Sequence, residues 1–213
     1  MEEQKPIGKP EKFWDIVSRR FVNSTRTMNS AALQTIKKDV NKFFKSTDIV
    51  LDFGCGPGDI TLVIAQNAQK VYATDISTGM IDAAKKKASE QNISNIKFTR
   101  TNLFDGKFQS NSFDKITAFN VLQYIEDKKQ LYSKIHELLK PQGLFISATA
   151  CLRERKSALR FLMAGLTKLK IVPKIFLYKT SELENEMKGA GFKIIEATNI
   201  AKVPERFIIA QKD

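Results

Sequence analysis

Short apolar runs alternate with amphipathic segments between residues 48 and 150, and this order restricts the fold of the 213-residue chain more than any other feature. The pattern predicts buried strands at 48–53, 70–77, 95–100, 113–120 and 143–150. It predicts helices at 58–68, 78–91 and 127–140, the last of them stopped by Pro141. Strands joined through helices pair in parallel and need helices on both faces, so we expect a doubly wound α/β sheet.

The C-terminal segment has a different pattern. A helix is predicted at 179–191, followed by strands at 192–200 and 205–212. Only the sequence "AKVP" separates these two strands. A parallel return would need a crossover of about a dozen or more residues. We therefore expect a mainly parallel seven-stranded sheet with an antiparallel last strand.

The length of the chain allows one sizeable α/β domain with appendages. We expect a single domain over residues 1–213. Its parts are expected to be an N-terminal helical cap at 1–46, a ligand-binding core at 47–150, a basic amphipathic insertion at 151–180, and a C-terminal helix with an antiparallel strand pair at 181–213. Two helices within 11–46, separated by a polar break, would form the cap.

Several classes of protein are disfavoured by composition. No apolar run reaches the roughly 20 residues that span a bilayer, and the polar first ten residues hold no signal-peptide core. We therefore expect a cytoplasmic protein without a transmembrane segment. Two cysteines and one histidine form neither a disulfide framework nor a recognisable zinc spacing, so no metal site is predicted. His136, on the predicted helix 127–140, is expected to be structural.

The formal net charge is +12, and its excess lies mainly outside the core. Residues 151–180 carry eight basic side chains and one acidic side chain among many apolar ones. This segment is interpreted either as a surface helix with a solvated basic face or as a lid over an apolar or anionic acceptor, which could contact an anionic membrane surface. No recognisable nucleic-acid-binding module accompanies the charge.

Three glycines at alternate positions, Gly54, Gly56 and Gly58, lie between the first predicted strand and the first helix of the core. Ligands of open α/β sheets bind beyond the carboxyl ends of the strands, where this turn is expected. Glycine lets the backbone bend and approach a ligand without a Cβ collision. The turn is therefore the first candidate binding element.

The motif "LDFGCGPGD", followed by "ATDIS", resembles the first two motifs of the Rossmann-like (class I) methyltransferases that use S-adenosylmethionine (SAM). The likeness covers residues 45–150 well and 180–213 loosely. It implies an enzyme that binds SAM and releases S-adenosylhomocysteine (SAH). The small-molecule type is favoured because "FNVL" stands where nucleic-acid and protein enzymes of the family often have Asn/Asp-Pro-Pro-Tyr.

The resemblance also implies which residues bind the cofactor. Asp52 would help to position the methionine moiety, and Asp75 would accept hydrogen bonds from both ribose hydroxyls. The implied set is Asp52, Gly54, Gly56, Gly58, Asp75, Ile76, Met80, Asn102, Leu103 and Asn120.

Four of these positions concern the adenine. Ile76 and Met80 would flank the ring, although plain core packing is an equal interpretation for Met80. Asn102 stands where many relatives have Asp, and its side-chain carbonyl can still accept from the adenine amino group. The backbone N–H of Leu103 would also meet the ring. The carbonyl of Asn120 would instead meet the amine of SAM.

A dinucleotide is the alternative ligand of such a turn. A phosphate-binding turn has the spacing G-x-G-x-x-G at a helix N-terminus, whereas this chain has G-x-G-x-G followed directly by Asp59. A carboxylate at that place would repel a diphosphate but not SAM, which carries no phosphate. The sequence therefore favours SAM over NAD.

Catalytic residues are not evident. Tyr124 is a weak candidate, because it could transfer a proton, line the acceptor pocket, stack on the cofactor or simply pack. The stretch "FWDIVSRRF" resembles a W-D-x-x-A-x-x-Y motif of relatives, with Phe21 near the place of the aromatic hydroxyl. Arg19, Arg20 or Arg26 could meet the methionine carboxylate.

The resulting hypothesis is a SAM-dependent methyltransferase that acts on a small-molecule acceptor of apolar or anionic character. An RNA or protein methyltransferase and a non-catalytic SAM-binding subunit or sensor are the alternatives.

Overall fold

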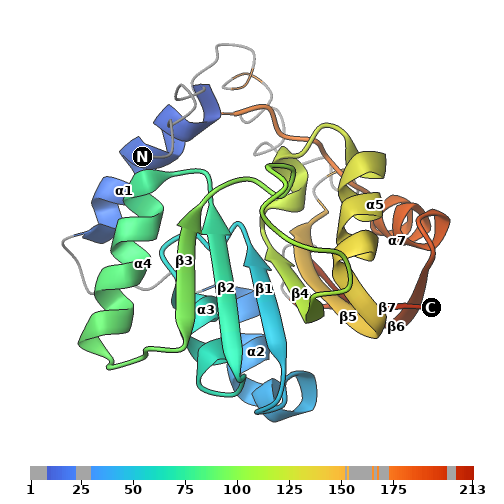
Figure 1. The fold of residues 1–213 in the computed structure, drawn as a ribbon. Coiled ribbons are helices and arrows are strands. Elements are labelled where there is room, and N and C mark those ends of the chain that lie inside the picture. The colour runs from blue at the N-terminus through green and yellow to red at the C-terminus, as the bar shows by residue number, and fades with distance from the viewer. Residues whose placement is uncertain are drawn as a thin grey trace.

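Among the described residues, seven strands form one sheet with helices on both faces (Figure 1). The computed structural model describes residues 9–22, 30–151, 153, 165, 167, 173–200 and 205–213. The helical elements are α1 (Lys9–Val22), α2 (Ala31–Phe43), α3 (Asp59–Ala65), α4 (Thr78–Glu90), the 3-10 turn η1 (Leu122–Tyr124), α5 (Lys128–Leu138) and α7 (Thr180–Gly189). The strands are β1 (Ile49–Phe53), β2 (Lys70–Asp75), β3 (Ile96–Arg100), β4 (Phe113–Phe119), β5 (Leu139–Ala150), β6 (Phe192–Asn199) and β7 (Glu205–Lys212).

The strand order is β3-β2-β1-β4-β5-β7-β6. The first five of these strands pair in parallel, and β7 is antiparallel to both of its neighbours, β5 and β6. The predicted doubly wound, mainly parallel sheet with an antiparallel last strand is therefore confirmed. The chain runs outward from β1 in one direction and returns to β4 on its other side, which places a switch point between these two strands.

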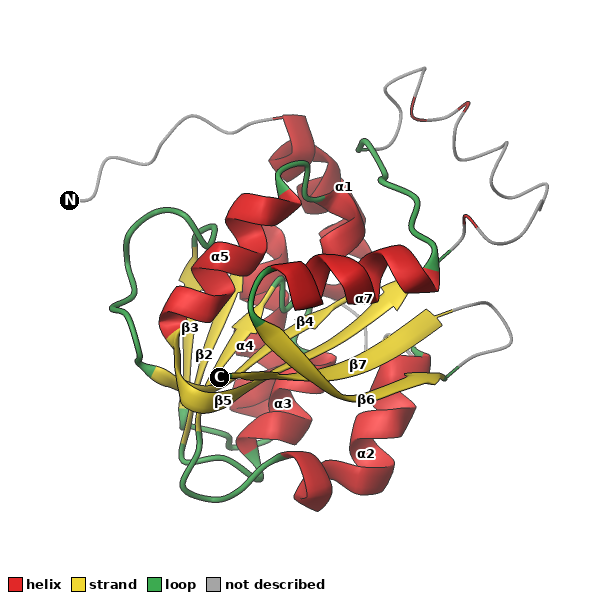
Figure 2. Ribbon diagram, turned by 90° about the vertical axis from the view of Figure 1, so that its right-hand side faces the viewer, coloured by secondary structure: helices red, strands yellow, loops and turns green. Residues whose placement is uncertain are grey.

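Alternation along each strand gives the sheet a core on both faces. Val50 and Leu51 are both fully buried, yet they belong to separate hydrophobic clusters, as do Phe145 and Ile146. Successive side chains of a strand point to opposite faces, so a continuous apolar run contributes side chains to the cores on both faces of the sheet. Helices α5 and α7 cover one face and α2 and α3 cover the other (Figure 2).

The predicted boundary at Pro141 is wrong. Helix α5 ends at Leu138, and β5 begins at Leu139 and runs through Pro141. Leu139 is fully buried and pairs with Phe113, after which the register between β4 and β5 shifts. A strand irregularity tolerates proline because the missing N–H has no ladder partner there. Burial of Leu139 in the core has overridden the helical spacing of the sequence.

The other predicted helices and strands are present, with ends displaced by three residues or fewer. The strand predicted at 70–77 stops at Asp75 because Ser77 acts as the N-cap of α4, accepting a hydrogen bond from the N–H of Met80. Most of the insertion predicted at 151–180 lies outside the described residues. None of the described helices is long and apolar enough to cross a membrane. The cytoplasmic location stays a prediction.

One buried ion pair joins β4 to the start of β1. Lys115 donates to the carboxylate of Asp48, and their side chains are only 8% and 7% exposed. The same carboxylate oxygen also accepts from the N–H of Lys45. Removal of one partner from such a pair leaves a charge in a low-dielectric site.

We expect Lys115→Met to lower the free energy of unfolding by about 3–5 kcal/mol, because Asp48 would lose its cation while the alkyl chain is kept. The second substitution Asp48→Asn should recover part of this loss, since it removes the unpaired charge and keeps an acceptor. Urea unfolding of both variants measures the effect. The matched control is Lys134→Met, which breaks a more exposed pair with Glu137 and should cost less than about 0.5 kcal/mol. Equal costs for the two lysines would contradict the prediction.

Candidate functional site

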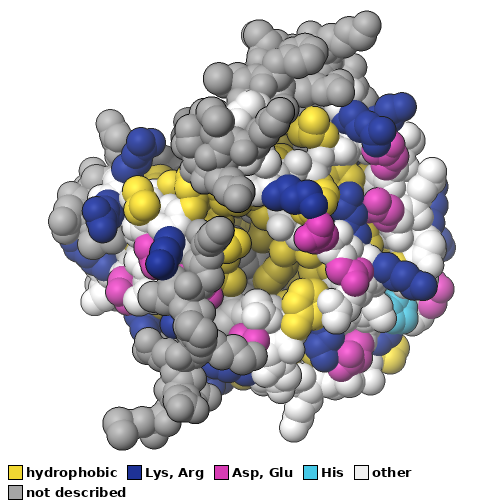
Figure 3. Space-filling model, turned by 90° about the horizontal axis from the view of Figure 1, so that it is seen from above, with side chains coloured by type: hydrophobic (Ala, Val, Ile, Leu, Met, Phe, Trp, Pro, Cys, Tyr) yellow, Lys and Arg dark blue, Asp and Glu magenta, His cyan; other side chains and the backbone are white. Residues whose placement is uncertain are grey.

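A cavity of about 450 Å³ opens at the carboxyl ends of β1, β2 and β4, next to the switch point of the sheet. Figure 3 looks onto this end of the molecule, where hydrophobic side chains gather around the hollow. Of the residues predicted for the site, the cavity is bordered by Asp52, Gly54, Gly56, Asp75, Ile76, Met80, Asn102, Asn120 and Tyr124. Gly58 and Leu103 are not among the bordering residues.

The three glycines of the turn have different tasks. All have positive φ, at +70°, +53° and +82° for Gly54, Gly56 and Gly58. A Cβ on Gly54 would lie 2.6 Å from Val121 Cγ2, and one on Gly58 would lie 2.9 Å from the Cβ of Ala84. A Cβ on Gly56 would meet nothing within 4 Å. Gly54 and Gly58 are thus required by packing, whereas Gly56 leaves bare backbone beside the cavity.

Asp75 lies at the end of β2 and is held by backbone donors on both sides. Its Oδ2 accepts from the N–H of Gly56 at 3.0 Å, and its Oδ1 accepts from the N–H of Ser77 at 2.9 Å. Burial raises the pKa of the Asp75 carboxyl to about 6, although these backbone donors favour the charged form. Each carboxylate oxygen keeps lone-pair capacity for a ligand hydroxyl.

Asp52 forms part of the floor of the cavity. It is 2% exposed, and its two oxygens accept from the hydroxyls of Thr61 on α3 at 2.6 Å and Thr117 on β4 at 2.7 Å. Burial raises the pKa of its carboxyl, and the two hydroxyls oppose that shift. Asp52 therefore fastens α3 and β4 to β1. Its predicted role toward the methionine moiety stays a prediction.

The charge of Asp59 is compensated, so the expected repulsion of a diphosphate is corrected here. Its carboxylate forms an ion pair with Lys87 of α4 at 2.7 Å, with side chains 8% and 11% exposed. The positive charge compensates the acid, so repulsion of a diphosphate by Asp59 is weaker than the sequence suggests. The spacing of the glycines still disfavours a phosphate-binding turn.

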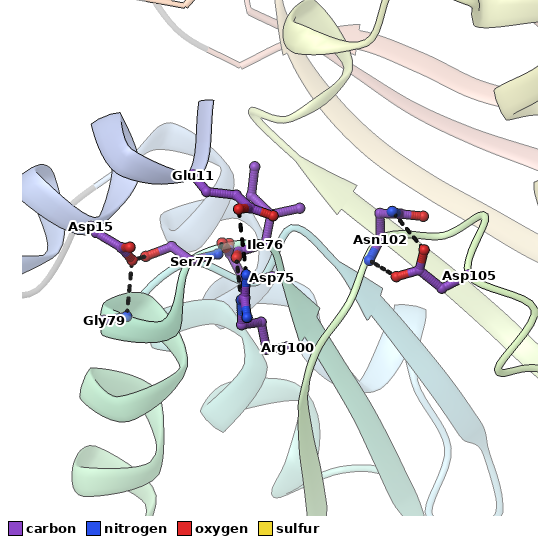
Figure 4. Close-up of polar contacts among 9 residues, drawn as sticks. All are labelled: Glu11, Asp15, Asp75, Ile76, Ser77, Gly79, Arg100, Asn102 and Asp105. Atoms are coloured by element: carbon purple, nitrogen blue, oxygen red, sulfur yellow. Dashed lines mark hydrogen bonds and ion pairs between the residues drawn. The ribbon is translucent and has the colours of Figure 1, made fainter. Parts of the chain in front are cut away.

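The predicted adenine side of the cavity contains a side-chain network that the sequence analysis did not foresee (Figure 4). The Oδ1 of Asn102 accepts from the N–H of Phe104 at 2.7 Å, and its Nδ2 donates to Asp105 at 2.8 Å. Asp105 also accepts from Thr101 Oγ1 at 2.7 Å. The Oδ1 of Asn102, which was expected to accept from the adenine amino group, thus already accepts one internal hydrogen bond. The spacing of Asn102 and Asp105 in "TNLFD" was the available signal for such a turn.

Asn120 follows β4 with a φ of +55°. Its carbonyl accepts from Gln123 Nε2 at 3.0 Å, and its side chain donates to Glu205 Oε1 at 3.1 Å. The carbonyl expected to meet the amine of SAM therefore carries one internal hydrogen bond and has a second lone pair. Gln123 and Glu205 are further residues that the sequence analysis missed, because nothing in their spacing relates them to Asn120.

Aromatic side chains form the outer wall. Trp14 of α1 borders the cavity and packs edge-on against Tyr124, with ring centroids 5.2 Å apart. Phe176 borders it from the described end of the 151–180 segment, and its N–H donates to the carbonyl of Gln123 at 2.8 Å. The cavity therefore has polar groups at the glycine turn and a wall of three aromatic rings, those of Trp14, Tyr124 and Phe176, which we call its mouth.

The other N-terminal residues considered for the cofactor site do not line the cavity as far as the structure describes them. Phe21 lies under the ammonium of Lys87 at 5.8 Å and does not border the cavity. Arg19 and Arg20 are exposed and are not bordering residues either. Arg26 lies outside the described residues. The position of Phe21 is explained by α1 packing on α4, which turns this face of the helix toward Lys87.

Neither Cys55 nor Tyr124 is suited to act as a base at neutral pH. Burial, together with the charges of Asp75 and Asp52, raises the pKa of the Cys55 thiol well above its usual value. Burial also raises the pKa of the Tyr124 phenol. His136 of α5 does not border the cavity, and its ring packs edge-on against Phe192 with centroids 5.2 Å apart.

Comparison with known proteins agrees with this geometry. Residues 44–199 match a family described as "Methyltransferase domain". The chain is 32% identical to the demethylmenaquinone methyltransferase of Symbiobacterium thermophilum over 126 residues, which are 57% of this chain and 49% of that protein. It is 28% identical to a ubiquinone biosynthesis O-methyltransferase of Actinobacillus pleuropneumoniae over 168 residues, 76% of this chain and 68% of that protein. The chain thus spans about half the length of the first relative.

Solved structures share the fold. The magnesium protoporphyrin IX methyltransferase of Synechocystis PCC 6803, solved with bound SAH, superposes with a TM-score of 0.72 at 19% identity. The superposition covers 95% of this chain and 98% of that chain. The family match over most of the chain and the shared fold lead to one assignment. The chain belongs to the methyltransferase domain family.

Proposed function

We propose that this chain transfers a methyl group from SAM to a small, mainly apolar acceptor that binds at the mouth of the cavity. One observation carries the proposal, namely that a single cavity joins two environments. Its floor has the bare backbone of Gly56 and the carboxylate of Asp75. Its mouth has the aromatic rings of Trp14, Tyr124 and Phe176. A polar cofactor and an apolar acceptor can then meet inside one enclosure.

The residues of the floor fit the cofactor. Asp75 would accept from the ribose hydroxyls, and the open side of Gly56 would let the ligand approach the backbone. Ile76 and Met80 border the cavity and would flank the adenine. SAM supplies the chemistry, which is an activated methyl group on a sulfonium leaving group. The chain itself has to orient the acceptor and exclude water, which can contribute several kcal/mol, up to about 7–11.

Acceptor character is inferred from the mouth of the cavity. Its aromatic rings favour an acceptor that is mainly apolar. The names of the relatives refer to small molecules, which supports an acceptor of that size. Lys174 borders the rim, where its ammonium pairs with Glu126 at 2.6 Å and lies over the Phe176 ring at 4.7 Å. An anionic substituent on the acceptor could replace Glu126 as its partner.

We assign no dedicated base, and we infer an acceptor that has already lost its proton to solvent when its anionic atom takes the methyl group and SAH leaves. The phenol of Tyr124, with its raised pKa, stays protonated and would donate a hydrogen bond. Acceptors that are already anionic need no base, and a base would otherwise be worth about two to four orders of magnitude. Nothing in the described residues favours the RNA, protein or non-catalytic alternatives over this reading.

The proposal is tested with SAM that carries a labelled methyl group. The wild-type chain is incubated with a panel of small apolar ring compounds, some of them with a hydroxyl or carboxylate, and separately with RNA and with protein. Label in a small compound supports the proposal. Label only in RNA or protein, or no label anywhere despite SAH binding, would overturn it.

We expect Asp75→Ala to remove most of the stabilisation by SAH. A ligand at 100 times its Kd stabilises by about 2.7 kcal/mol, which corresponds to a Tm shift of roughly 5–11 °C for a chain of this size. Thermal unfolding with and without SAH measures the shift. The exposed Asp82 of α4 provides the control, because Asp82→Ala should keep the full shift. A full shift in Asp75→Ala would refute the role of the carboxylate.

The affinity for SAH should also fall with acid. The pKa of Asp75 is raised to about 6 in the unliganded protein, and the charged form accepts the ribose hydrogen bonds. Protonation therefore competes with binding, so the apparent Kd should be nearly constant above pH 7 and rise up to about tenfold per unit below pH 6. Calorimetric titration between pH 5 and 7.5 measures this slope. Asp75→Asn should bind weakly without the slope, and a flat wild-type profile would contradict the prediction.

A further inference from the structure

We propose that Asp15 is a positioning residue. By hydrogen bonding to the N-terminus of α4 it holds α1 against the cofactor site, an arrangement that we call the seating of α1. The inference rests on the proposed function, because Asp75 and Met80 are cofactor residues only if the cavity holds SAM. It adds a residue that does not itself border the cavity.

The contacts of Asp15 lead directly to the site (Figure 4). Its Oδ1 accepts from the hydroxyl of Ser77 at 2.5 Å and from the N–H of Gly79 at 3.2 Å. Ser77 in turn donates its N–H to Asp75 at 2.9 Å, and its hydroxyl oxygen accepts from the N–H of Met80 at 3.1 Å. One serine thus connects the carboxylate of α1 with the ribose and adenine positions. The negative charge also suits the N-terminus of a helix.

A second contact fixes the start of α1. Glu11 forms an ion pair with Arg100 of β3 at 3.4 Å, and Arg100 Nε donates to the carbonyl of Ile76 at 3.2 Å. Helix α1 is therefore attached at two points to the segment between Asp75 and Gly79, which carries the cofactor contacts. Two points of attachment fix its direction as well as its distance.

Helices α1 and α4 pack too closely here to accept a side chain at Gly79. A Cβ on Gly79 would lie 2.0 Å from Ser18 Oγ, so α1 and α4 approach each other through a residue without a side chain. Ser18 is only 2% exposed, and its hydroxyl donates to the carbonyl of Asp15 at 2.7 Å. The two helices are in close contact at the position where Asp15 acts.

Trp14 is placed by the same arrangement. It precedes Asp15, borders the cavity and packs on Tyr124. The position of α1 therefore sets the place of Trp14 in the aromatic wall and holds Ser77, which is one of the two residues that donate to Asp75. A ligand that binds to groups already held in position loses less conformational entropy than one that must order them. Loss of the Asp15 contacts should accordingly weaken cofactor binding without removing any cofactor contact.

The test uses Trp14, the only tryptophan of the chain, as its own probe. We expect Asp15→Ala to shift Trp14 emission to longer wavelength, to increase its quenching by acrylamide, and to weaken SAH on the order of tenfold. Asp15→Asn should restore both properties, because an amide oxygen accepts the same two hydrogen bonds. Lys12→Ala, an exposed change on the same helix, is the control and should match the wild type.

A second variant keeps the test decisive if Asp15→Ala fails to fold. Gly79→Ala improves the helix propensity of α4 and leaves Asp15 intact, yet its Cβ would push against Ser18 and unseat α1. It should change Trp14 emission and SAH affinity in the same directions. Normal emission and affinity in folded Asp15→Ala or Gly79→Ala, or an Asp15→Asn variant as weak as Asp15→Ala, would overturn the proposal. Failure of the wild type to bind SAH would instead refute the proposed function, and Trp14 emission would still report the seating.

Discussion

The hydrogen bond from Gly56 to the carboxylate of Asp75 joins the turn after β1 to the end of β2, and the geometry of the cavity depends on it. It can form only because parallel pairing puts the carboxyl ends of neighbouring strands at one edge of the sheet. The positive φ of Gly56 directs its N–H to that edge. Ser77 holds the other carboxylate oxygen, so the helix that follows β2 is fixed by the same acid.

Acidic groups are gathered beneath this cavity at a cost to the unliganded protein. Burial raises the pKa of both Asp52 and Asp75, which shows that their charged forms are disfavoured where they lie. Asp52 is satisfied by two hydroxyls and Asp59 by Lys87, whereas Asp75 keeps acceptor capacity toward the cavity. A ligand that donates to Asp75 would offset that cost. The buried carboxylates thus make folding less favourable at the site where a ligand is expected to bind.

Much of this arrangement could be predicted from the sequence, and the failures have physical reasons. The apolar runs fixed the sheet because Val50 and Leu51 face different cores, and Gly56 and Asp75 met because strand ends must meet. The boundary predicted at Pro141 was wrong because burial of Leu139 decides where α5 ends. Pairs such as Asn120 with Gln123 and Asp15 with Ser77 depend on side-chain directions in the folded state, which no spacing rule specifies.

The position of β7 has a consequence for how the chain acquires its structure. This strand follows β6 in the chain, yet it lies between β5 and β6. Strand β6 cannot join the sheet until β7 has paired with β5, so the edge of β5 stays open during synthesis until Glu205–Lys212 has left the ribosome. An open edge is a template for pairing with other chains. The growing polypeptide therefore carries an unpaired strand edge until β7 docks, and this edge is exposed to other chains during that time.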